Sequence, residues 1–579
     1  MNGKKKLVGF LAEDAFSDYA KEILLGLQNA IEAYPDIRLV VIAGRHNRTE
    51  DFDNNQYSYK TIYNSVYRLE EMCRLDGLIL LAGSTSQFKE QQVAQNFLMN
   101  LNNVPKVYIG ARVQGGVSVN YDNEPGIREM TDWLVNAYGF TEFCMLGGRD
   151  DNEDSKDRKR IFMECLNENG ITLAENQYEK TDMSADCENQ AARLLVRNPG
   201  VQAIFCVNDE VAKGLYREMK KRELVPGKDI MVIGFDNSHA AENMIPPLAS
   251  IGAEADMLGQ KALDVLMGII AGKKEESVMI RTRLYGRESL PYERYEYTTK
   301  EMAGVNREFI LRMFDDCFYR YKNVHHTREE VNLRELFYEF IYRMLSAMRR
   351  RYMSPEEFAE INGLIDIFFD RDAMQYTDSE RFVQSITKLQ SGMNFVQKSV
   401  AANVLNNRLF VHMKDLAIRA LTRQVSAERR QYYAEQKRIH EFLIESTPFQ
   451  GTGEEAMERM LQNIGKLGLL NAALYLYENP VVYSLKYMNL FPDEFRLMCV
   501  MREGNLQVIP KEKRICPVGN LLLREELPAR CRSYVAFPVL YSYYVYGVLL
   551  CELTEEILDR GEYLAAQIGR AIFVNDSGW

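Results

Sequence analysis

Polar side chains directly follow apolar runs at several points between Val207 and Ser289. Asn208-Asp209 comes after one run, Asp236-Asn237 after a second, and Arg287-Glu288-Ser289 closes the series. Each run predicts a buried parallel strand, and the ligands of open α/β sheets bind beyond the carboxyl ends of such strands. A carboxylate accepts hydrogen bonds from hydroxyl groups, and an amide both donates and accepts them. These residue types therefore predict a receptor site for a small polar molecule.

Motifs for catalysis and metal binding are missing from the sequence. The chain contains no Gly-x-Ser-x-Gly, His-Glu-x-x-His or Walker-type motif, and no Gly-x-Gly-x-x-Gly after a strand. His325-His326 lacks a third ligand at metal spacing, and the acidic run at 150–154 lacks the glycine and terminal glutamate of a calcium loop. We therefore expect a protein that is not an enzyme and that uses no cofactor and no metal.

Length, charge and cysteine usage limit the class of protein. The 579 residues suggest roughly three to four domains, and the formal net charge of -11 argues against nucleic-acid binding by the chain as a whole. The 10 cysteines form no Cys-x-x-Cys pair, which favours buried thiols in a reducing compartment. The apolar stretch 7–12 is too short for a signal peptide, and no run approaches the length of a membrane helix. We expect a cytoplasmic protein with no membrane partner.

Strand and helix patterns alternate from Lys6 to about Leu290. Apolar runs predict strands at 7–12, 38–43, 76–81, 104–109, 117–121, 142–146, 202–207 and 230–235. Amphipathic runs predict helices at 17–33, 126–138, 155–167 and 209–221. Such alternation implies parallel sheets with right-handed crossovers. Because the pattern runs in two series, we expect two lobes that face a cleft.

Eight phrases in this region resemble, in the same order, the effector-binding core of the LacI/GalR repressors. They are Leu75-Asp76-Gly77-Leu78-Ile79-Leu80, Val104-Pro105 with Ile109-Gly110, Val119-Asn120-Tyr121-Asp122-Asn123, Asn208-Asp209 with Ala212 and Gly214, Val232-Ile233-Gly234-Phe235-Asp236-Asn237, Pro247-Leu248, Leu258-Gly259-Gln260, and Arg287-Glu288-Ser289. The resemblance implies the type I periplasmic binding protein fold for residues 1–290, about half of the chain. Repressors of this family begin with a helix-turn-helix. Here the first core strand begins at Leu7, so we expect the sensor without that DNA reader.

The resemblance also implies a ligand site. The family's effector-binding aspartate and arginine match Asp236 and Arg158. Because a guanidinium donates in a fixed fork, the pair suits polyols, sugars or anions. Ala253 and Ala255 stand where the family commonly has larger side chains, so a wider pocket than a plain hexose needs is expected. The other positions expected in the pocket are Asp14, Phe16, Met183 and Asn208.

Structural roles remain open for several of these residues. Asp236 could serve only its turn, Arg158 could be a solvated helix charge, and Phe16 could belong to the core. Asp209 is expected to cap its helix rather than to touch the ligand. Arg287-Glu288-Ser289 is expected to close the last strand with an ion pair and a hydroxyl.

The segment 291–447 is predicted to be helical. Thr327-x-x-Glu330 is a capping box, and Ser354-Pro355 provides a cap with a proline at the first helical position. No glycine or proline occurs from Met393 to Thr447, where apolar residues recur at spacings of three and four. This pattern predicts one long helix, either packed in a bundle or paired as a coiled coil with a second subunit. Because such a helix outruns a compact core, we favour the pairing.

Residues 448–579 are similar in pattern to the GAF family of sensory and dimerisation modules. We expect a helix at 454–467, strands at 472–477, 494–502, 506–509, 533–540 and 545–551, and a closing helix at 554–574. The whole chain is thus predicted as a two-lobed α/β sensor, an all-α segment with a long helix, and an α+β GAF-like domain.

The functional hypothesis is a cytoplasmic ligand sensor. A sugar, nucleoside or similar metabolite would close two lobes, and the helices would relay that closure to a partner or to a downstream effector such as a diguanylate cyclase. A homodimer through the helical and GAF-like regions is expected, and direct binding to nucleic acid is not. Three alternatives stay open. One is a LacI-type regulator that acts on DNA through a non-standard or partner-supplied element, the second is a binding protein whose carboxyl half only dimerises, and the third is an enzyme with its site in the GAF-like domain.

Overall fold

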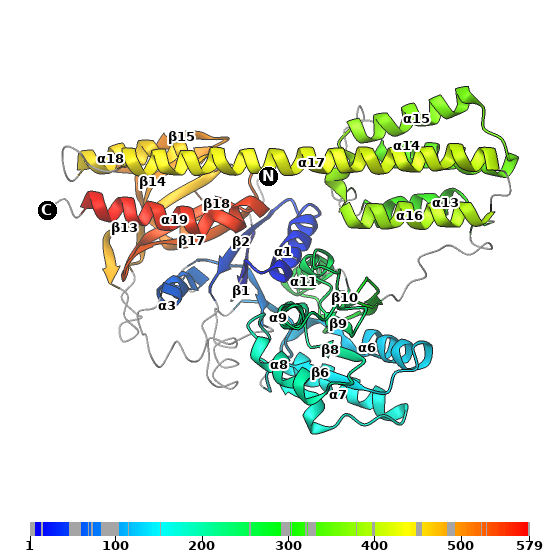
Figure 1. The fold of residues 1–579 in the computed structure, drawn as a ribbon. Coiled ribbons are helices and arrows are strands. Elements are labelled where there is room, and N and C mark those ends of the chain that lie inside the picture. Colours follow the sequence, from blue (N-terminus) through cyan, green and yellow to red (C-terminus); the bar gives the residue numbers. More distant parts are fainter. Residues whose placement is uncertain are drawn as a thin grey trace. The chain divides into compact units, whose positions relative to one another are not determined.

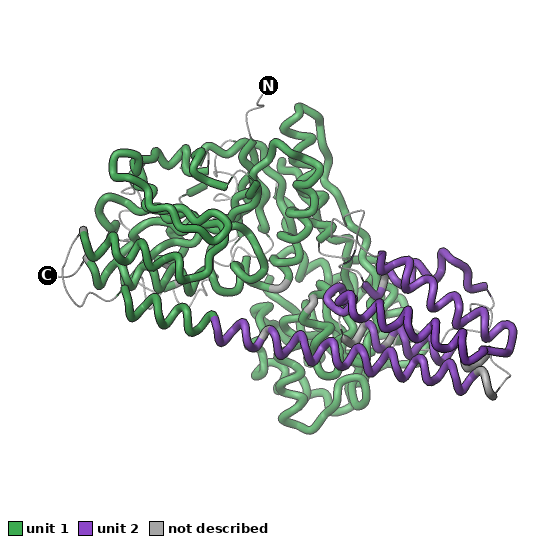
Figure 2. The backbone as a smooth tube through the Cα atoms, turned by 90° about the horizontal axis from the view of Figure 1, so that it is seen from above, with its two compact units in different colours: residues 1–292, 435–579 green, residues 293–434 purple. Residues whose placement is uncertain are grey.

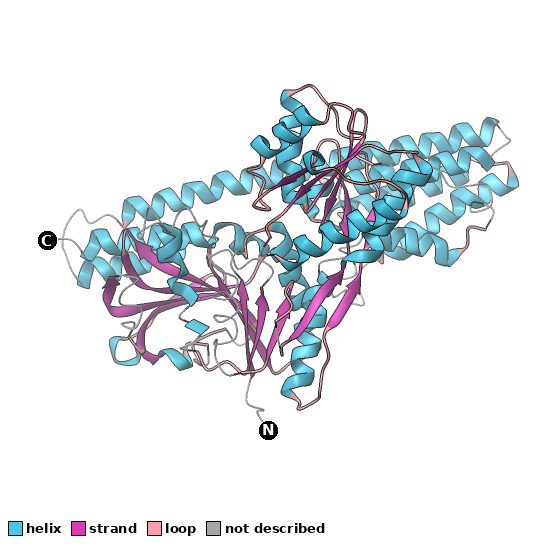
Figure 3. Ribbon diagram, turned by 90° about the horizontal axis from the view of Figure 1, so that it is seen from below, coloured by secondary structure: helices cyan, strands magenta, loops and turns pink. Residues whose placement is uncertain are grey.

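The computed structural model of the chain describes residues 6–12, 15–45, 59–67, 69–70, 73–82, 104–113, 115–150, 152–253, 256–290, 302, 304–318, 321, 332–377, 379–396, 400–446, 454–482, 492–522, 524–528 and 530–576. The chain forms two compact units (Figure 2). Unit 1 comprises residues 1–292 and 435–579, and unit 2 comprises residues 293–434. Figure 3 shows that unit 2 is built from helices, whereas the strands of unit 1 gather in sheets.

A parallel sheet forms the first lobe of unit 1 (Figure 1). Its strands follow the order β11-β5-β4-β3-β1-β2. They are β1 (Lys6–Ala12), β2 (Ile37–Ala43), β3 (Gly77–Leu81), β4 (Lys106–Ile109), β5 (Val117–Asp122) and β11 (Val278–Arg281). All residues of β2, and all of β1 except the first, are buried. Near-continuous burial is typical of parallel strands that are covered on both faces, which is why these runs carry no polar alternation.

Two helices of this lobe pack closely together. Ser17 caps α1 (Asp18–Ile31) by accepting from the Ala20 amide, and α11 (Asp256–Ile270) lies against α1. Short helical turns, α3 (Tyr59–Tyr63) and η1 (Asn64–Tyr67), follow β2.

The second lobe contains a six-stranded sheet in the order β12-β10-β9-β8-β6-β7. Its strands are β6 (Phe143–Gly147), β7 (Tyr178–Lys180), β8 (Ala203–Cys206), β9 (Met231–Phe235), β10 (Ala249–Gly252) and β12 (Arg283–Tyr285). The sheet is parallel except at β12, which pairs antiparallel with β10. The helices of this lobe are α6 (Asn123–Asp132), η2 (Trp133–Ala137), α7 (Glu153–Glu168), α8 (Glu188–Arg197), α9 (Asp209–Lys221) and α10 (His239–Glu242).

The chain passes between the two lobes more than once. It leaves the first sheet after β5, returns after β10 through α11, and crosses again between β11 and β12. The two parallel lobes predicted from the alternating pattern are therefore present.

The sheet of the first lobe continues into the carboxyl-terminal residues. Strand β17 (Ser533–Tyr541) pairs parallel with β2, with Ser533 opposite Leu39 and Ala536 opposite Ile42. The antiparallel strands β18 (Tyr544–Glu552), β13 (Ala472–Val482), β14 (Glu494–Arg502) and β15 (Asn505–Val508) follow. With β16 (Ile515–Pro517), which also pairs with β14, the sheet has 12 strands. Helices α18 (Glu454–Asn463) and α19 (Glu555–Asp576) complete this region. The helices and strands predicted for residues 448–579 are present, but neither β16 nor the pairing with β2 was predicted.

Unit 2 has a phenylalanine-rich core of its own. Its helices are α13 (Arg307–Cys317), α14 (Leu333–Arg350), α15 (Pro355–Asp370), α16 (Ser379–Val396) and the first part of α17 (Val400–Glu445). Ser354 caps α15 with Pro355 at its start, as predicted. The expected capping box at 327–330 lies outside the described residues. The predicted long helix is present, although it begins at Val400 rather than at Met393, since Ser379–Val396 forms α16.

Of the helices that the structure describes, none combines the length and the apolar character needed to cross a membrane.

Candidate ligand-binding site

The Arg158 guanidinium lies at the centre of the candidate site. Helix α7 carries it, and Asn152 caps that helix by accepting from the Ser155 amide at 2.8 Å. The side chain is only 4% exposed. It donates from Nη1 to the Val207 carbonyl at 2.8 Å and from Nη2 to Asp236 Oδ1 at 3.1 Å. A charge buried in this way needs partners, so Arg158 is not a solvated helix charge.

Two further contacts fix the orientation of this guanidinium. Its Cζ stands 3.6 Å from the centre of the Phe235 ring, which is a cation–π arrangement. Its Nε faces Asn123 Oδ1 at 3.4 Å, at the start of α6. The partners of Arg158 thus come from the ends of β8 and β9 and from a helix start, which is the edge of a parallel sheet where ligands bind.

Asp236 is held in an unusual backbone conformation directly after β9. Its φ is 102°, a region that residues other than glycine rarely adopt and that costs free energy. The Asp236 amide donates to the Ile251 carbonyl at 2.8 Å, and Gly252 leaves room for this close approach. The side chain remains 19% exposed. Burial raises the pKa of Asp236 to about 7, while Arg158 opposes the shift.

The first lobe contributes two tyrosines to the same region. Tyr19 of α1 and Tyr121 of β5 have ring centres 6.5 Å apart, and Tyr121 lies 6.3 Å from Phe235 of the second lobe. Burial raises the pKa of both tyrosines, and the charges of Asp236 and Arg158 act on both. The buried Tyr121 hydroxyl has no hydrogen-bond partner among the described residues. The two lobes therefore present a carboxylate, a guanidinium, aromatic rings and an unused hydroxyl to one region.

The predicted residues Asn208 and Met183 lie together. Asn208 caps α9 by accepting from the Val211 amide at 2.9 Å, and its amide nitrogen donates to the Met183 carbonyl at 3.0 Å. Met183 has a φ of 68° and packs close to Gly148. The contacts described for Asn208 thus hold a turn. A ligand role for either residue stays a prediction.

Phe16 packs against the carboxyl-terminal residues. Its ring stacks on Phe537 of β17 with the centres 6.2 Å apart, and the Arg45 guanidinium stands 4.2 Å above it. Ala253 is buried beside the strand ends. The predicted residues Asp14 and Ala255 lie outside the described residues.

The prediction that Asp209 caps its helix is wrong, because Asn208 takes that place. Asp209 accepts from the Ser238 amide at 2.8 Å, from Ser238 Oγ at 2.9 Å and from Ser250 Oγ at 2.7 Å. Burial raises the pKa of Asp209 to about 6, and these hydrogen bonds oppose the shift. The buried Asp209 therefore links, through hydrogen bonds, the turn after β9 to strand β10.

The closing role predicted for Arg287 and Ser289 is confirmed. Arg287 donates to the Leu248 carbonyl at 2.8 Å and forms an ion pair with Glu242 at 2.9 Å. Ser289 donates to the Val232 carbonyl at 2.6 Å and accepts from the Ala249 amide at 2.7 Å.

Sequence reasoning missed Tyr19, Tyr121, Phe235 and Asn123 as site residues. The last three belong to the two family-like phrases 119–123 and 232–237, so their nearness in sequence to Asp236 and to the end of β5 was an available signal. Tyr19 stands in the first turn of α1, and nothing in the sequence separates it from a core residue.

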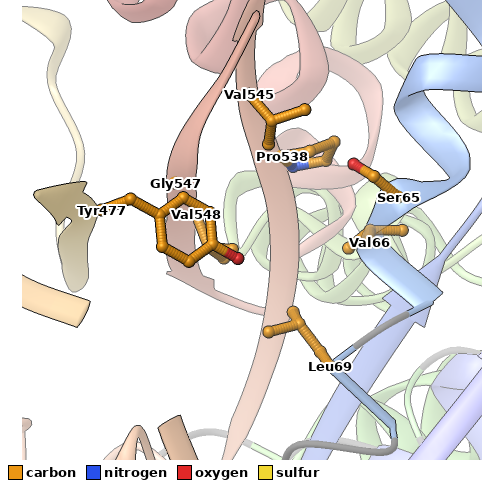
Figure 4. Close-up of a pocket in the computed structure, with 8 residues that line it drawn as sticks. All are labelled: Ser65, Val66, Leu69, Tyr477, Pro538, Val545, Gly547 and Val548. Carbon is orange, nitrogen blue, oxygen red and sulfur yellow. The ribbon is translucent and has the colours of Figure 1, made fainter. Parts of the chain in front are cut away.

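A small, open hollow lies between η1 and the carboxyl-terminal strands (Figure 4). It is lined by Ser65, Val66, Leu69, Tyr477, Pro538, Val545, Gly547 and Val548. Ligand sites combine an apolar wall with several convergent polar groups, and this lining offers only two hydroxyls. Among the described residues no group of three His, Cys, Asp or Glu side chains could hold a metal ion.

Comparisons with known proteins agree with the lobes described above. A family model of the periplasmic binding protein-like domain matches residues 135–290. Residues 135–290 are thus similar to a periplasmic binding protein-like domain. Catabolite control protein A of Staphylococcus aureus (strain N315) is 24% identical over 253 residues, which is 43% of this chain and 70% of that protein. The ribose operon repressor of Escherichia coli (strain K12) is 29% identical over 197 residues, which is 34% of this chain and 58% of the repressor.

Solved structures of regulators are also similar to this domain. The transcriptional regulator CelR in complex with cellobiose is 22% identical, covers 50% of this chain and 86% of that chain, and has a TM-score of 0.41. The Lac repressor bound to ONPG is 22% identical, covers 50% of this chain and 83% of that chain, and has a TM-score of 0.40. The names of these relatives and structures are those of a control protein, two repressors and a transcriptional regulator.

Proposed function

We propose that residues 6–290 bind a small polar metabolite, such as a sugar or a nucleoside, between the two lobes and that the chain acts as a ligand-responsive regulator. The supporting observation is the ion pair between the buried Arg158 and Asp236, beside the Phe235 ring that Tyr121 of the opposite lobe contacts. A hydroxyl-rich ligand can donate to the carboxylate and accept from the guanidinium and the tyrosine hydroxyl. The aromatic rings supply apolar faces that a sugar or a base can cover.

The energy for the response comes from the difference in contacts between two states. A ligand that contacts both lobes binds the closed arrangement better than the open one, and it shifts their equilibrium by that difference in affinity. Because the chain crosses between the lobes at several points, closure changes the angle of these connections rather than their fold.

Closure can reach the carboxyl-terminal residues through the shared sheet. Strand β1 leads to Phe16, which stacks on Phe537, and β1 pairs with β2, which pairs with β17. The site would lie in a domain of residues 1–290, followed by helices at 291–447 and a GAF-like domain at 448–579. These regions would pass the signal to a partner or to a downstream effector such as a diguanylate cyclase, in a cytoplasmic homodimer.

Transcriptional regulation is the second candidate. The names of the relatives, a catabolite control protein and a ribose operon repressor, favour it. In that case DNA would be read by a non-standard or partner-supplied element. Binding of the full chain to DNA that weakens steeply with salt would support this candidate, and its absence would favour the effector hypothesis.

A thermal-shift screen of sugars, nucleosides and amino acids tests the ligand site. A true ligand raises the melting temperature by mass action, by an amount that grows with its concentration. The shift should be lost in Asp236→Asn, a change that keeps the size of the side chain. It should persist in Lys156→Ala, because Lys156 is on the same helix as Arg158 but is 47% exposed and forms a surface ion pair with Glu153. Equal shifts in Asp236→Asn and the unaltered chain would refute the site, and so would the absence of a shift with every compound.

A further inference from the structure

Exposed apolar side chains recur at every seventh position along α17. Val404 is 53% exposed, Val411 64%, Ile418 60% and Val425 62%, and Tyr432 continues the series at 58%. All five belong to unit 2. We call this set the α17 stripe.

The α17 stripe is a different face of the helix from the one that packs in unit 2. Leu409, Phe410, Met413 and Ala417 are buried in the core of that unit. Asn407 and Lys414 are bonded to Gln390 of α16 at 2.9 and 3.0 Å. The apolar spacing noticed in the sequence is therefore explained by the bundle, whereas the α17 stripe is not.

Solvent exposure alone does not account for these residue types. Valine and isoleucine are poorer helix formers than alanine, leucine or lysine, since their branched side chains lose rotamer freedom. An exposed helix face that only met water would gain from lysine or glutamate at these positions. In a straight helix with 3.6 residues per turn, side chains spaced by seven drift slowly around the helix axis. They stay on one line when the helix supercoils with a second helix.

We propose that the α17 stripe is the surface through which a second copy of this chain pairs with the first, helix against helix. From Val404 to Tyr432 the helix rises by about 42 Å, at 1.5 Å per residue, which is four heptads. β-branched residues such as valine and isoleucine at the a position of a heptad are typical of two-stranded coiled coils.

The flank of the stripe suits self-pairing. Arg408 and Asp415 flank the stripe, because each stands four residues after a stripe residue, Val404 and Val411. The flank therefore carries both signs of charge, and each copy can offer the charge that the other needs. The surface needs no partner with a different pattern, because it is complementary to itself.

The test is the mass of the full chain in solution. Sedimentation should show a species of twice the 67.0 kDa chain mass, and the double variant Val411→Lys/Ile418→Lys should raise its dissociation constant at least tenfold. Lysine is a better helix former than either residue, so the helix should persist, and an unchanged far-ultraviolet spectrum will verify this. The added positive charge lowers the magnitude of the net charge of -11, so general repulsion between copies does not increase.

The matched control places the same two charges on the opposite side of α17. Ala427 and Ala434 are exposed and lie about half a turn away from the stripe. The variant Ala427→Lys/Ala434→Lys should remain dimeric. A monomeric unaltered chain, or a dimer that survives Val411→Lys/Ile418→Lys, would overturn the proposal. Neither result bears on ligand binding, which the thermal-shift screen measures separately.

Discussion

The protonation of Asp236 can be followed without a ligand, and it tests how the folded chain surrounds this carboxyl. Burial raises the pKa of this carboxyl from 3.8 to about 7, and burial raises that of Asp209 from 3.8 to about 6. A raised pKa means that the folded chain holds the proton more tightly than the unfolded chain does. Each protonated carboxyl therefore stabilises the folded chain fully at a pH below its pKa in the unfolded chain. This stabilisation is lost as the pH rises through its pKa in the folded chain.

The first prediction follows from that sign. The free energy of unfolding should fall between pH 5 and pH 8 at constant ionic strength, as measured by urea denaturation. In Asp236→Asn the fall should be smaller, because the amide does not ionise, and the variant should gain on the unaltered chain as the pH increases. A free energy of unfolding that rose over this interval, with the same slope in both proteins, would show that Asp236 is not buried as described.

The close packing of helices α1 and α11 requires a glycine in each helix. A Cβ on Gly259 would lie 2.1 Å from the Ile23 carbonyl oxygen, and one on Gly26 would lie 1.9 Å from that of Asp256. The two helices therefore meet backbone to backbone. This contact holds α11, the segment that returns the chain from the second lobe to the first.

We expect Gly259→Ala to destabilise the chain by about 1–3 kcal/mol, the usual effect of overpacking. This result would be opposite in sign to the intrinsic preference, because alanine favours helix over glycine by about 1 kcal/mol. Gly200→Ala is the control, since nothing lies within 4 Å of its Cβ position, and it should change stability by less than about 0.5 kcal/mol. Urea denaturation of the three proteins provides the comparison, and a neutral or stabilising Gly259→Ala would contradict the close crossing.

At the scale of the whole molecule, the sequence predicted the features that depend on neighbouring residues and not those that join distant segments. Strands such as β1 and β9 were predictable because burial on both faces produces an unbroken apolar run. The pairing of Arg158 with Asp236 was accessible only through the family resemblance. The pairing of β2 with β17 had no signal, because it joins segments almost 500 residues apart whose apolar runs look the same with or without it. The long helix was predicted. Its two apolar faces could be distinguished only in the structure, where one of them packs in the core of unit 2.

Because the first lobe and the carboxyl-terminal strands share one sheet, we expect them to unfold cooperatively. One continuous core includes residues of both lobes and of the carboxyl-terminal strands, whereas unit 2 has a separate core. Gly547 of β18 has no room for a side chain, since its Cβ would lie 2.0 Å from the Tyr475 carbonyl oxygen. Gly547→Val should therefore loosen the carboxyl-terminal strands. Because β17 protects β2 through bonds such as Leu39 amide to Arg532 carbonyl at 2.8 Å, amides of β2 should exchange faster as well.

Hydrogen exchange of the full chain can measure this effect. An increase of about tenfold in β2 exchange corresponds to a loss of about 1.4 kcal/mol. Phe368→Ala is the control in unit 2, where Phe368 contacts Phe314, Phe318, Phe337 and Phe340. It should cost about 3–5 kcal/mol and speed exchange in α14 and α15 while leaving β2 unchanged. If Gly547→Val accelerated only the strands after Ala472, the carboxyl-terminal sheet would unfold independently of the first lobe. Lobe closure could then not travel along the sheet, and α17 would be the remaining route.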